Sequence, residues 1–363
     1  MFSDADKRHM ARALEIAALG LYTATPNPRV GCVIVREGRV VGEGWHLEAG
    51  APHAEANALA AAGDRASGAT AYVSLEPCNH HGRTPPCSEA LIRADVSRVV
   101  AAMHDPNPQG AGGGRKLEGA GIRFECGLMG DEARELNIGF VSRMTRGRPW
   151  VRMKIAASLD GRTALANGQS QWITGSEARK DGHAWRARAC AVLTGIGTVA
   201  ADDPRLDVRE VETPRQPLRI IVDSRLETPP TARILQGGNV LVFCASDLPE
   251  QRAALEGRGA EVVVLADANG KVALPAMLAA LAARGINELH VEAGVKLNGS
   301  MLREGCVDEL LVYLAPSLLG DGAQGMAALA AMTSLDERVA LAFRSVDRVG
   351  ADLRILARLQ EAH

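Results

Sequence analysis

The sequence is poor in aromatic residues and carries almost no net charge. Aromatics make up 3% of its 363 residues, so the cores must be filled by Val, Ile, Leu and Ala. The formal net charge is -2. A basic surface for nucleic acid is therefore missing at the level of the whole chain, and any anionic ligand must be met by local arginines or helix N-termini.

The chain also has few cysteines and no long apolar run. Seven cysteines, an odd and widely scattered set, argue against the disulfide framework of a small secreted protein. The segment MFSDADKR at 1–8 is polar, unlike a signal peptide. No run approaches the roughly 18 apolar residues that a membrane span needs. We therefore expect a cytoplasmic protein with neither a membrane nor a nucleic acid as partner.

The length exceeds what one hydrophobic core usually supports, so two domains are expected. TRGRPW at 145–150 is short, basic and contains Gly and Pro, as linkers often do. We place the domains at 1–146 and 147–363. Apolar β-rich runs alternate with helical stretches in both, which predicts two α/β domains.

The periodicity predicts the individual elements. In the first domain we expect helices at 3–20, 53–62, 88–94 and 132–145, and strands at 30–35, 39–45, 69–76, 97–103 and 122–127. The glycine-rich segment 109–115 is expected to be a surface loop. In the second domain we expect a last edge strand at 353–359, helices at 274–284 and 297–303, and buried strands at 151–161, 189–197, 218–224, 239–246, 260–266, 288–294 and 309–316.

The strongest chemical signal is His53-Ala54-Glu55 followed by Pro77-Cys78 and Cys87. One His and two Cys supply three ligands that suit zinc, and a catalytic zinc keeps a fourth position for water. The pKa of such a water falls toward roughly 7. Glu55 is then available as a proton shuttle for deamination. The general deaminase signature, H-x-E then P-C-x-x-C, is not matched, because eight residues separate the two cysteines.

Two other interpretations stay open at this point. Cys78 and Cys87 could be ordinary thiols with His53 as a polar cap, or the zinc could be structural, with His80 or His81 as a fourth ligand. We favour a catalytic zinc because His-x-Glu and Pro-Cys occur together. The other cysteines mostly lie in apolar runs, as small core residues do: Cys32, Cys126, Cys190, Cys244 and Cys306.

Several segments of the first domain together resemble the deaminase domain of the bifunctional riboflavin-biosynthesis deaminase/reductases. They are TPNPRVGCVIV at 25–35, HAEANAL at 53–59, EPCNHHGRTPPC at 76–87, MHDPNPQ at 103–109 and ELNIGF at 135–140. The long cysteine spacing is this family's own pattern. The resemblance implies a cytidine-deaminase-like α/β/α domain in which His53, Cys78 and Cys87 hold Zn2+, Glu55 moves protons and Asn27 contacts the pyrimidine.

Without the family, the second half offers weaker signals. HVEAGVKLNGSMLREG at 290–305 is a strand, a glycine turn and a helix, whose N-terminus can bind phosphate, although a plain βα connection fits equally well. Ser224 and Arg225, after an apolar strand, suit the 2′-phosphate of NADPH, whereas Asp223 beside them suits a 2′-hydroxyl. The charges alone leave the cofactor open.

The second half nevertheless resembles the reductase domain of the same family, which has a dihydrofolate-reductase-like α/β fold and uses NADPH. The matching segments are KIAASLDG at 154–161, SQWITG at 170–175, HAWRA at 183–187, GTVAADDPRLDVR at 197–209, IVDS at 221–224 and VEAGVKLNGSML at 291–302. The resemblance implies substrate contacts from Ser170, Arg186, Leu206, Arg209 and Glu292. It implies NADPH contacts from Ala156, Trp172, Thr198, Asp202, Ser224, Gly294, Val295, Lys296, Leu297, Asn298, Gly299 and Ser300.

Physical chemistry bears on three residues of this match, two arginines and one alanine. Arg186 and Arg209 suit a substrate phosphate, because the guanidinium fork matches phosphate oxygens. Ala293 stands where this loop commonly carries a second Gly, so a positive φ at that position would strain it.

The resemblance covers nearly the whole chain and implies two successive reactions. The first domain would hydrolyse the exocyclic amine of 2,5-diamino-6-ribosylamino-4(3H)-pyrimidinone 5′-phosphate. The second would transfer hydride from NADPH to the ribose C1′ and so produce a ribityl chain. The expected partner is this phosphorylated pyrimidine, and a homodimer through the reductase domain is expected because the family's reductase domains tend to pair.

Two rival hypotheses remain. One is a nucleoside or tRNA deaminase fused to an unrelated nucleotide-binding domain. The other is non-enzymatic, a structural zinc module joined to a nucleotide-sensing domain.

Overall fold

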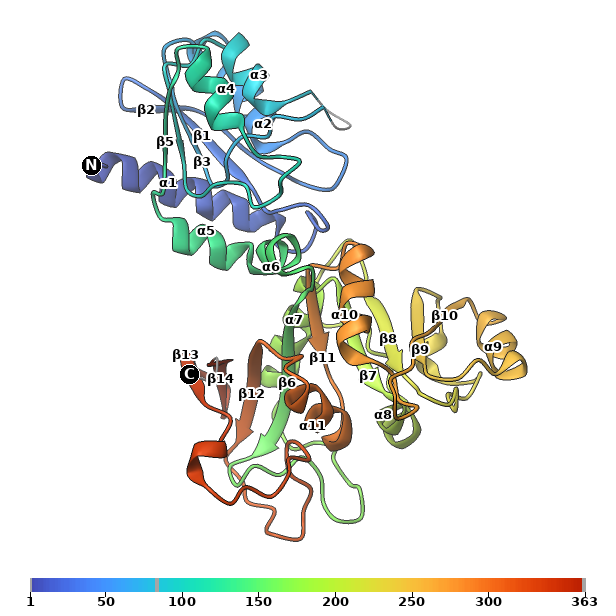
Figure 1. Ribbon diagram of the computed structural model, residues 1–363. Helices are drawn as coiled ribbons and strands as arrows, with labels where there is room; N and C mark the ends of the chain where they lie inside the picture. Colours follow the sequence, from blue (N-terminus) through green and yellow to red (C-terminus); the bar gives the residue numbers. More distant parts are fainter. Residues whose placement is uncertain (1, 82–84, 361–363) are drawn as a thin grey trace. The chain divides into compact units, whose positions relative to one another are not determined.

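The computed structural model describes residues 2–81 and 85–360. The chain divides into two compact units, Met1–Gly147 and Arg148–His363 (Figure 1). Each unit is built on one β-sheet with its own core. No helix in the described ranges is long and apolar enough to cross a membrane.

The first unit is a five-stranded sheet in the order β2-β1-β3-β4-β5. Its strands are β1 (Gly31–Arg36), β2 (Arg39–Trp45), β3 (Thr70–Val73), β4 (Arg98–Ala101) and β5 (Arg123–Cys126). Its helices are α1 (Asp4–Ala17), α2 (Ala54–Ala62), α3 (Cys87–Arg93), α4 (Gly113–Gly119), α5 (Gly130–Leu136) and α6 (Ile138–Arg146). Strand β1 pairs antiparallel with β2 and β3, whereas β3, β4 and β5 run parallel. Figure 1 shows α1 on one side of the sheet and α2, α3 and α4 on the other.

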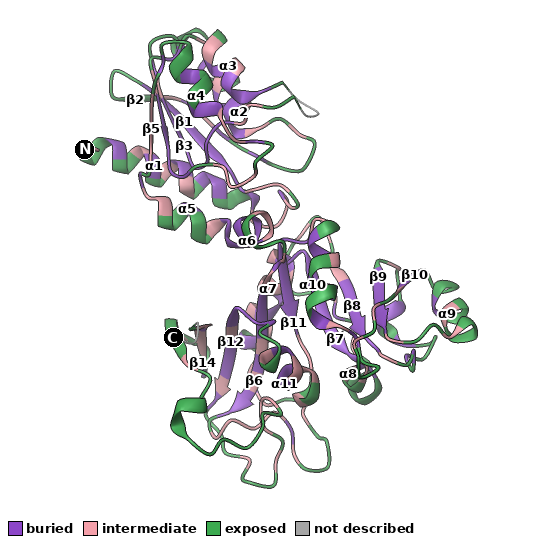
Figure 2. Ribbon diagram, viewed as in Figure 1, coloured by how far each residue is buried: buried purple, intermediate pink, exposed green. Residues whose placement is uncertain are grey.

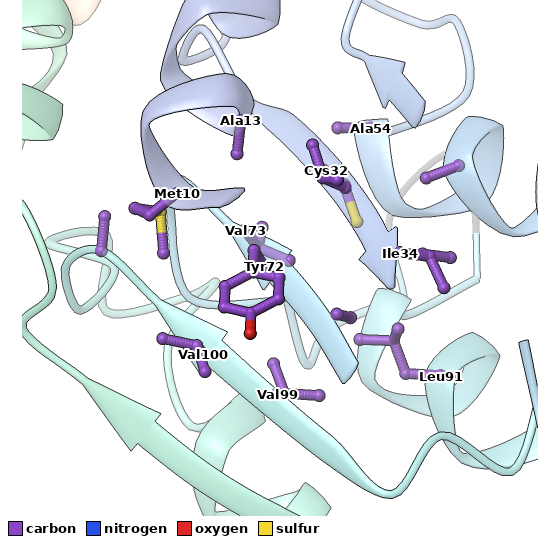
Figure 3. Packing of buried hydrophobic residues seen from close by; sticks show 14 of the residues in the cluster. Met10, Ala13, Cys32, Ile34, Ala54, Tyr72, Val73, Leu91, Val99 and Val100 are labelled. Carbon is purple, nitrogen blue, oxygen red and sulfur yellow. The ribbon is translucent and has the colours of Figure 1, made fainter. Parts of the chain in front are cut away.

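Small residues let the helices approach this sheet closely. A Cβ added to Gly31 of β1 would lie 2.1 Å from the carbonyl oxygen of Ala13 in α1, and one added to Gly42 of β2 would lie 2.2 Å from that of Ala58 in α2. Figure 3 shows Met10 and Ala13 of α1 and Leu91 of α3 in one cluster with side chains of β1, β3 and β4. A core of this kind needs few aromatics, as the composition indicates.

Two predictions for the first unit are wrong in detail. The single helix expected at 132–145 is two helices that meet at Asn137. The buried side chain of Asn137 accepts a hydrogen bond from the backbone N–H of Arg29 and donates one to the carbonyl oxygen of Arg29. The segment 109–115 is not wholly a surface loop, because Gly113 begins α4. A Cβ there would lie 1.8 Å from the carbonyl oxygen of Pro77, so this glycine allows close packing.

The second unit is a nine-stranded sheet in the order β10-β9-β8-β7-β11-β6-β12-β14-β13. Its strands are β6 (Trp150–Ser158), β7 (Ala191–Gly195), β8 (Leu218–Val222), β9 (Val240–Cys244), β10 (Ala260–Val264), β11 (Glu288–Val291), β12 (Glu309–Ala315), β13 (Leu341–Val349) and β14 (Asp352–Leu359). Its helices are α7 (Ser176–Arg188), α8 (Ile196–Asp202), α9 (Pro249–Glu256), α10 (Leu274–Ala283) and α11 (Val295–Arg303). The strands from β10 to β12 run parallel, and Figure 2 shows the central ones buried.

The expected edge strand at 353–359 is not at the edge. Strand β14 pairs antiparallel with both β12 and β13, and β13 forms this edge. The opposite edge is β10, so the strand expected to be buried at 260–266 is only partly buried. The sequence of β13, LAFRSVDRV, mixes charged and apolar residues, so it carries no clear signal of a buried strand. A turn at Gly350, whose φ is 63°, joins it to β14.

Candidate functional site

The first unit gathers the three residues predicted as metal ligands. His53 is the residue before α2, Cys87 is the first residue of α3, and Cys78 lies in the segment after β3. His53 Nδ1 lies 3.2 Å from Cys87 Sγ and 3.6 Å from Cys78 Sγ. Around a tetrahedral zinc, N and S ligands stand roughly 3.5 Å apart, given usual bond lengths. The donors and their spacing therefore fit zinc.

The neighbouring histidines do not join this group. Among the described residues, the cluster consists of His53, Cys78 and Cys87, whose ligand atoms all lie within 4.8 Å of one another. His81 is 73% exposed and its Nε2 lies 3.9 Å from Glu89. His80 lines the cavity beside the cluster. A set of three donors is what a catalytic zinc uses when it keeps one position for water.

Glu55 lies in the first turn of α2 and is 3% exposed. Burial, together with the nearby charge of Cys78, raises the pKa of Glu55 to about 7. It forms a hydrogen bond with Cys87 but is not part of the three-donor group. A carboxyl group that gains and loses a proton near neutral pH is suited to general acid and base catalysis.

The cluster opens into a cavity of about 880 Å³ that Asn27 also lines. Asn27 Nδ2 lies 3.0 Å from Nε2 of His46, whose Nδ1 lies 3.2 Å from the carbonyl oxygen of Pro52. Because a carbonyl oxygen only accepts, Nδ1 of His46 carries the proton and Nε2 accepts from Asn27. Sequence reasoning missed His46, since a lone histidine after a strand has no diagnostic spacing.

Glu76 lines the same cavity and was also missed. Its buried carboxylate accepts hydrogen bonds from the backbone of Asp105, Gly112 and Gly114, and it lies 3.0 Å from Nδ1 of His104. These bonds hold the segment 104–114 against the cavity that Asp105 and Asn107 line. Burial raises the pKa of Asp105 to about 6.

In the second unit, a cavity of about 1360 Å³ is lined by nearly all the residues expected to meet substrate and NADPH. The expected residues that line it are Ala156, Ser170, Trp172, Arg186, Thr198, Asp202, Leu206, Arg209, Ser224, Glu292, Gly294, Val295, Lys296, Leu297 and Asn298. Gly299 and Ser300 do not line it. A Cβ on Gly299 would lie 2.2 Å from the carbonyl oxygen of Ala328, and Ser300 Oγ accepts from Arg303. Both lie beyond the first turn of α11.

The start of α11 forms one wall of this cavity. Gly294 precedes the helix, and Ala293 does not have a positive φ, so the strain considered for that alanine is absent. A Cβ added to Gly294 would lie 3.6 Å from Thr198 Oγ1. Backbone N–H groups at a helix start bind phosphate groups. This wall therefore fits the phosphates of a dinucleotide.

An ion-pair cluster occupies the part of the cavity assigned to the substrate. Arg186 donates to both carboxylate oxygens of Glu292, at 2.5 and 2.9 Å, and Lys154 Nζ lies 3.7 Å from Glu292 Oε2. Burial alone would raise the pKa of Glu292, but the charges of Arg186 and Lys154 hold it well below its ordinary value. Sequence reasoning missed Lys154, although it begins the matching segment KIAASLDG.

Arg209 lies in the same region of the cavity. Its guanidinium forms an ion pair with Asp207, and its backbone N–H donates to Nδ1 of His183 at 3.2 Å. Burial and the charges of Arg186 and Arg209 lower the pKa of His183 to about 4, so this imidazole is neutral at pH 7. The guanidinium of Arg186 is engaged by Glu292 and by the carbonyl oxygen of Asp207, so of the two arginines expected to meet the phosphate, Arg209 is the better placed.

Family models match both units. The model described as "Cytidine and deoxycytidylate deaminase zinc-binding region" matches residues 3–103, and "RibD C-terminal domain" matches residues 149–355. The match of the first model covers all three clustered donors. The second covers every residue expected to line the larger cavity.

Whole-length relatives carry both units in the same order. Riboflavin biosynthesis protein RibD of Escherichia coli (strain K12) is 46% identical over 361 residues, which cover 96% of this chain and 98% of that protein. The protein of the same name from Aquifex aeolicus is 42% identical over 357 residues, which cover 98% of this chain and 99% of that protein.

Solved structures of such proteins superpose on the whole chain. Acinetobacter baumannii RibD, form 1, matches with a TM-score of 0.91 and 43% identity over 98% of this chain and 99% of that one. A diaminohydroxyphosphoribosylaminopyrimidine deaminase/5-amino-6-(5-phosphoribosylamino)uracil reductase from Thermotoga maritima matches with a TM-score of 0.87 and 32% identity. This match also covers 98% of this chain and 99% of that one. The expected deaminase-like and reductase domains are thus confirmed. The chain belongs to the RibD family of riboflavin biosynthesis proteins.

Proposed function

We propose that this chain is a bifunctional enzyme of riboflavin biosynthesis. Its first unit hydrolyses the exocyclic amine of 2,5-diamino-6-ribosylamino-4(3H)-pyrimidinone 5′-phosphate, and its second unit reduces the ribosyl side chain to ribityl with NADPH. The observation that carries the proposal is the group of His53, Cys78 and Cys87 with buried Glu55 beside it, at a cavity that His53, Glu55 and Cys78 line. A nucleoside or tRNA deaminase with an unrelated second domain does not explain relatives that match both units.

In the first unit, His53, Cys78 and Cys87 would hold Zn2+, which would act as a Lewis acid and make water a competent nucleophile near neutral pH. Glu55 accepts the proton of the attacking water and delivers protons to the ring nitrogen and to the leaving ammonia. Its buried position beside the three metal donors places it for both transfers. Asn27, held by His46, contacts the pyrimidine and orients it toward Glu55.

In the second unit, the start of α11 and the adjoining wall of the cavity bind NADPH, which supplies the hydride. Arg209 binds the substrate phosphate. Opening of the sugar requires a proton on its ring oxygen as C1′ is reduced. We assign that proton to Lys154, an ammonium group in the cavity that Glu292 holds in place.

We further propose that the chain forms a homodimer through the second unit and acts in the cytoplasm. The edge strand β13 exposes apolar side chains, with Phe343 71% and Val346 54% exposed, and such an edge suits a second copy of the chain. None of the described cysteines is part of a disulfide, which suits a reducing compartment. Light scattering of wild type and Phe343→Glu tests the dimer: the variant should be monomeric.

The most informative assay supplies the deaminated, phosphorylated intermediate with NADPH and follows the loss of NADPH absorbance. Wild type should consume NADPH, and Arg209→Ala should raise KM about tenfold or more because it removes a charge-assisted bond to phosphate. Arg258→Ala, an exposed arginine that does not line the cavity, serves as the control. Absence of NADPH consumption by wild type would refute the reductase assignment.

A further inference from the structure

Arg209, which binds the substrate phosphate in the proposed reductase reaction, lies on an irregular segment of the second unit. The described residues 203–209, between α8 and β8, belong to neither a helix nor a strand. Leu206 has a φ of 52°, in the left-handed region that is unfavourable for a leucine. Leu206 and Arg209 both line the cavity. Because the segment takes no part in the sheet or in a helix, its backbone groups need other partners.

Two side chains from other segments supply such partners. Nδ1 of His183, in α7, accepts a hydrogen bond from the backbone N–H of Arg209 at 3.2 Å. Gln216 bonds both backbone groups of Val208. Its Oε1 accepts from the N–H at 2.7 Å, and its Nε2 donates to the carbonyl oxygen at 3.0 Å. Neither His183 nor Gln216 is among the residues that line the cavity, so both act on the backbone of the segment and not on the substrate.

The chemical form and the position of His183 suit this contact. Because Nδ1 accepts, the proton of the neutral imidazole is on Nε2, which lies 3.9 Å from Oε1 of Glu210. His183 is 5% exposed, so water is a poor substitute for its Nδ1. Three residues further along α7, Arg186 donates to the carbonyl oxygen of Asp207 at 3.1 Å. The helix therefore holds the segment at two points, and His183 holds the residue that carries the phosphate-binding side chain.

We propose that His183 and Gln216 are positioning residues for the reductase reaction. By fixing the backbone at 208–209, they direct the Arg209 guanidinium toward the phosphate of the deaminated substrate. This inference rests on the proposed reductase function. Asp207 holds the guanidinium itself in an ion pair, so the side chain has few orientations left before the substrate arrives. A cation fixed in this way binds phosphate more tightly, because less conformational entropy is lost on binding.

The test measures KM of the full-length protein for the deaminated, phosphorylated intermediate, with NADPH in excess. His183→Leu should raise this KM about fivefold, the net effect of one hydrogen bond, and change kcat by less than about twofold. Gln216→Leu should raise it about twofold to threefold, since Gln216 is exposed and water can replace it. His183→Gln should restore the wild-type KM, because its side-chain oxygen accepts the same bond. Gln251→Leu, at an exposed position of α9, is the matched control.

Two further measurements separate positioning from a general structural role. The intermediate without its phosphate is tested as a competitive inhibitor, and its inhibition constant should be the same for wild type and His183→Leu. In an Arg209→Ala background, His183→Leu should change KM by less than about twofold, because the side chain that it positions is gone. Thermal unfolding of each variant verifies that it is folded.

Three results would overturn the inference and leave the reductase assignment standing. They are an equal loss of affinity for the phosphorylated and dephosphorylated compounds in His183→Leu, an undiminished effect of His183→Leu in the Arg209→Ala background, and a failure of His183→Gln to restore KM. If wild type does not consume NADPH with the phosphorylated intermediate, the reductase function fails together with this inference.

Discussion

The two cavities are built on different principles. In the first unit, three side chains meet within 4.8 Å, and the motifs that carry them lie within 35 residues of one another. In the second unit, the lining residues come from segments between 154 and 328, and several of the charged ones are paired with one another. Metal coordination demands short, directional bonds, whereas a dinucleotide is held by many weaker contacts. One lost contact should therefore abolish the first activity but only weaken the second.

The largest effect should come from removing the metal. Prolonged treatment with a strong chelator should abolish deamination, because the water then lacks its activating Lewis acid. NADPH-dependent reduction of the deaminated intermediate should continue, since no metal-ligand group of three or more occurs among the described residues of the second unit. Ammonia release and NADPH consumption are measured on the same sample, and added zinc should restore the first. Parallel loss of both activities would contradict the separation of the two sites.

The next largest effect tests the proton shuttle. Glu55→Gln should reduce kcat of deamination by about 10² to 10⁴, because the amide keeps the shape of the carboxyl but transfers no proton. Zinc content, measured by atomic emission, and reductase activity should both be unchanged. Glu118→Gln, at an exposed position of α4, is the matched control. Loss of zinc in Glu55→Gln would make Glu55 a ligand and overturn its assignment.

A smaller loss is expected in the second unit. Lys154→Met should lower kcat of reduction by about 10² while the dissociation constant of NADPH stays within about twofold, because the change removes a proton donor rather than a cofactor contact. Deamination should be unchanged. If Lys154→Met instead raises only KM for the substrate, Lys154 positions the substrate and another group supplies the proton.

The contrast between the two units also explains what could be predicted from the sequence. His53, Cys78 and Cys87 were predictable because zinc accepts few residue types and the motifs place them at helix starts and strand ends. Six of the seven strands that were expected to be buried in the second unit were predictable because their apolar runs are nearly continuous, whereas β10 lies at an edge of the sheet and is only partly buried. The α/β class followed from the alternation of strands and helices.

Features that depend on tertiary partners could not be predicted. Position 113 is glycine because the carbonyl oxygen of Pro77 leaves room only for a hydrogen atom there, and 35 residues lie between the two. The direction of the Asp223 carboxylate is decided by Thr228, which local charge patterns do not reveal. Lys154 and His46 lie in their cavities without any diagnostic spacing, so only the fold identifies them.

The smallest expected effect is on the stability of the first unit, and it tests whether the two units unfold separately. Buried Asp6 of α1 accepts hydrogen bonds from Tyr72 and Arg98, each at 2.7 Å, and from Ser3. Burial alone would raise the pKa of Asp6, but these bonds hold it well below its ordinary value of 3.8. The ionised carboxylate therefore stabilises the folded first unit above about pH 4, and this contribution is lost as the pH falls further.

Asp6→Asn should accordingly lower the free energy of unfolding of the first unit by about 2 kcal/mol at pH 7, because the amide replaces a charged acceptor of several bonds. Calorimetry should show the transition of the first unit shifted down and that of the second unit in place. Tyr72→Phe removes one donor and should cost about 1 kcal/mol. The difference between wild type and Asp6→Asn should shrink below pH 4, where the Asp6 carboxylate of the unfolded wild type begins to bind a proton while that of the folded state is still ionised. A difference that stays constant down to pH 2 would mean that packing around Asp6, rather than its charge, carries the stabilisation.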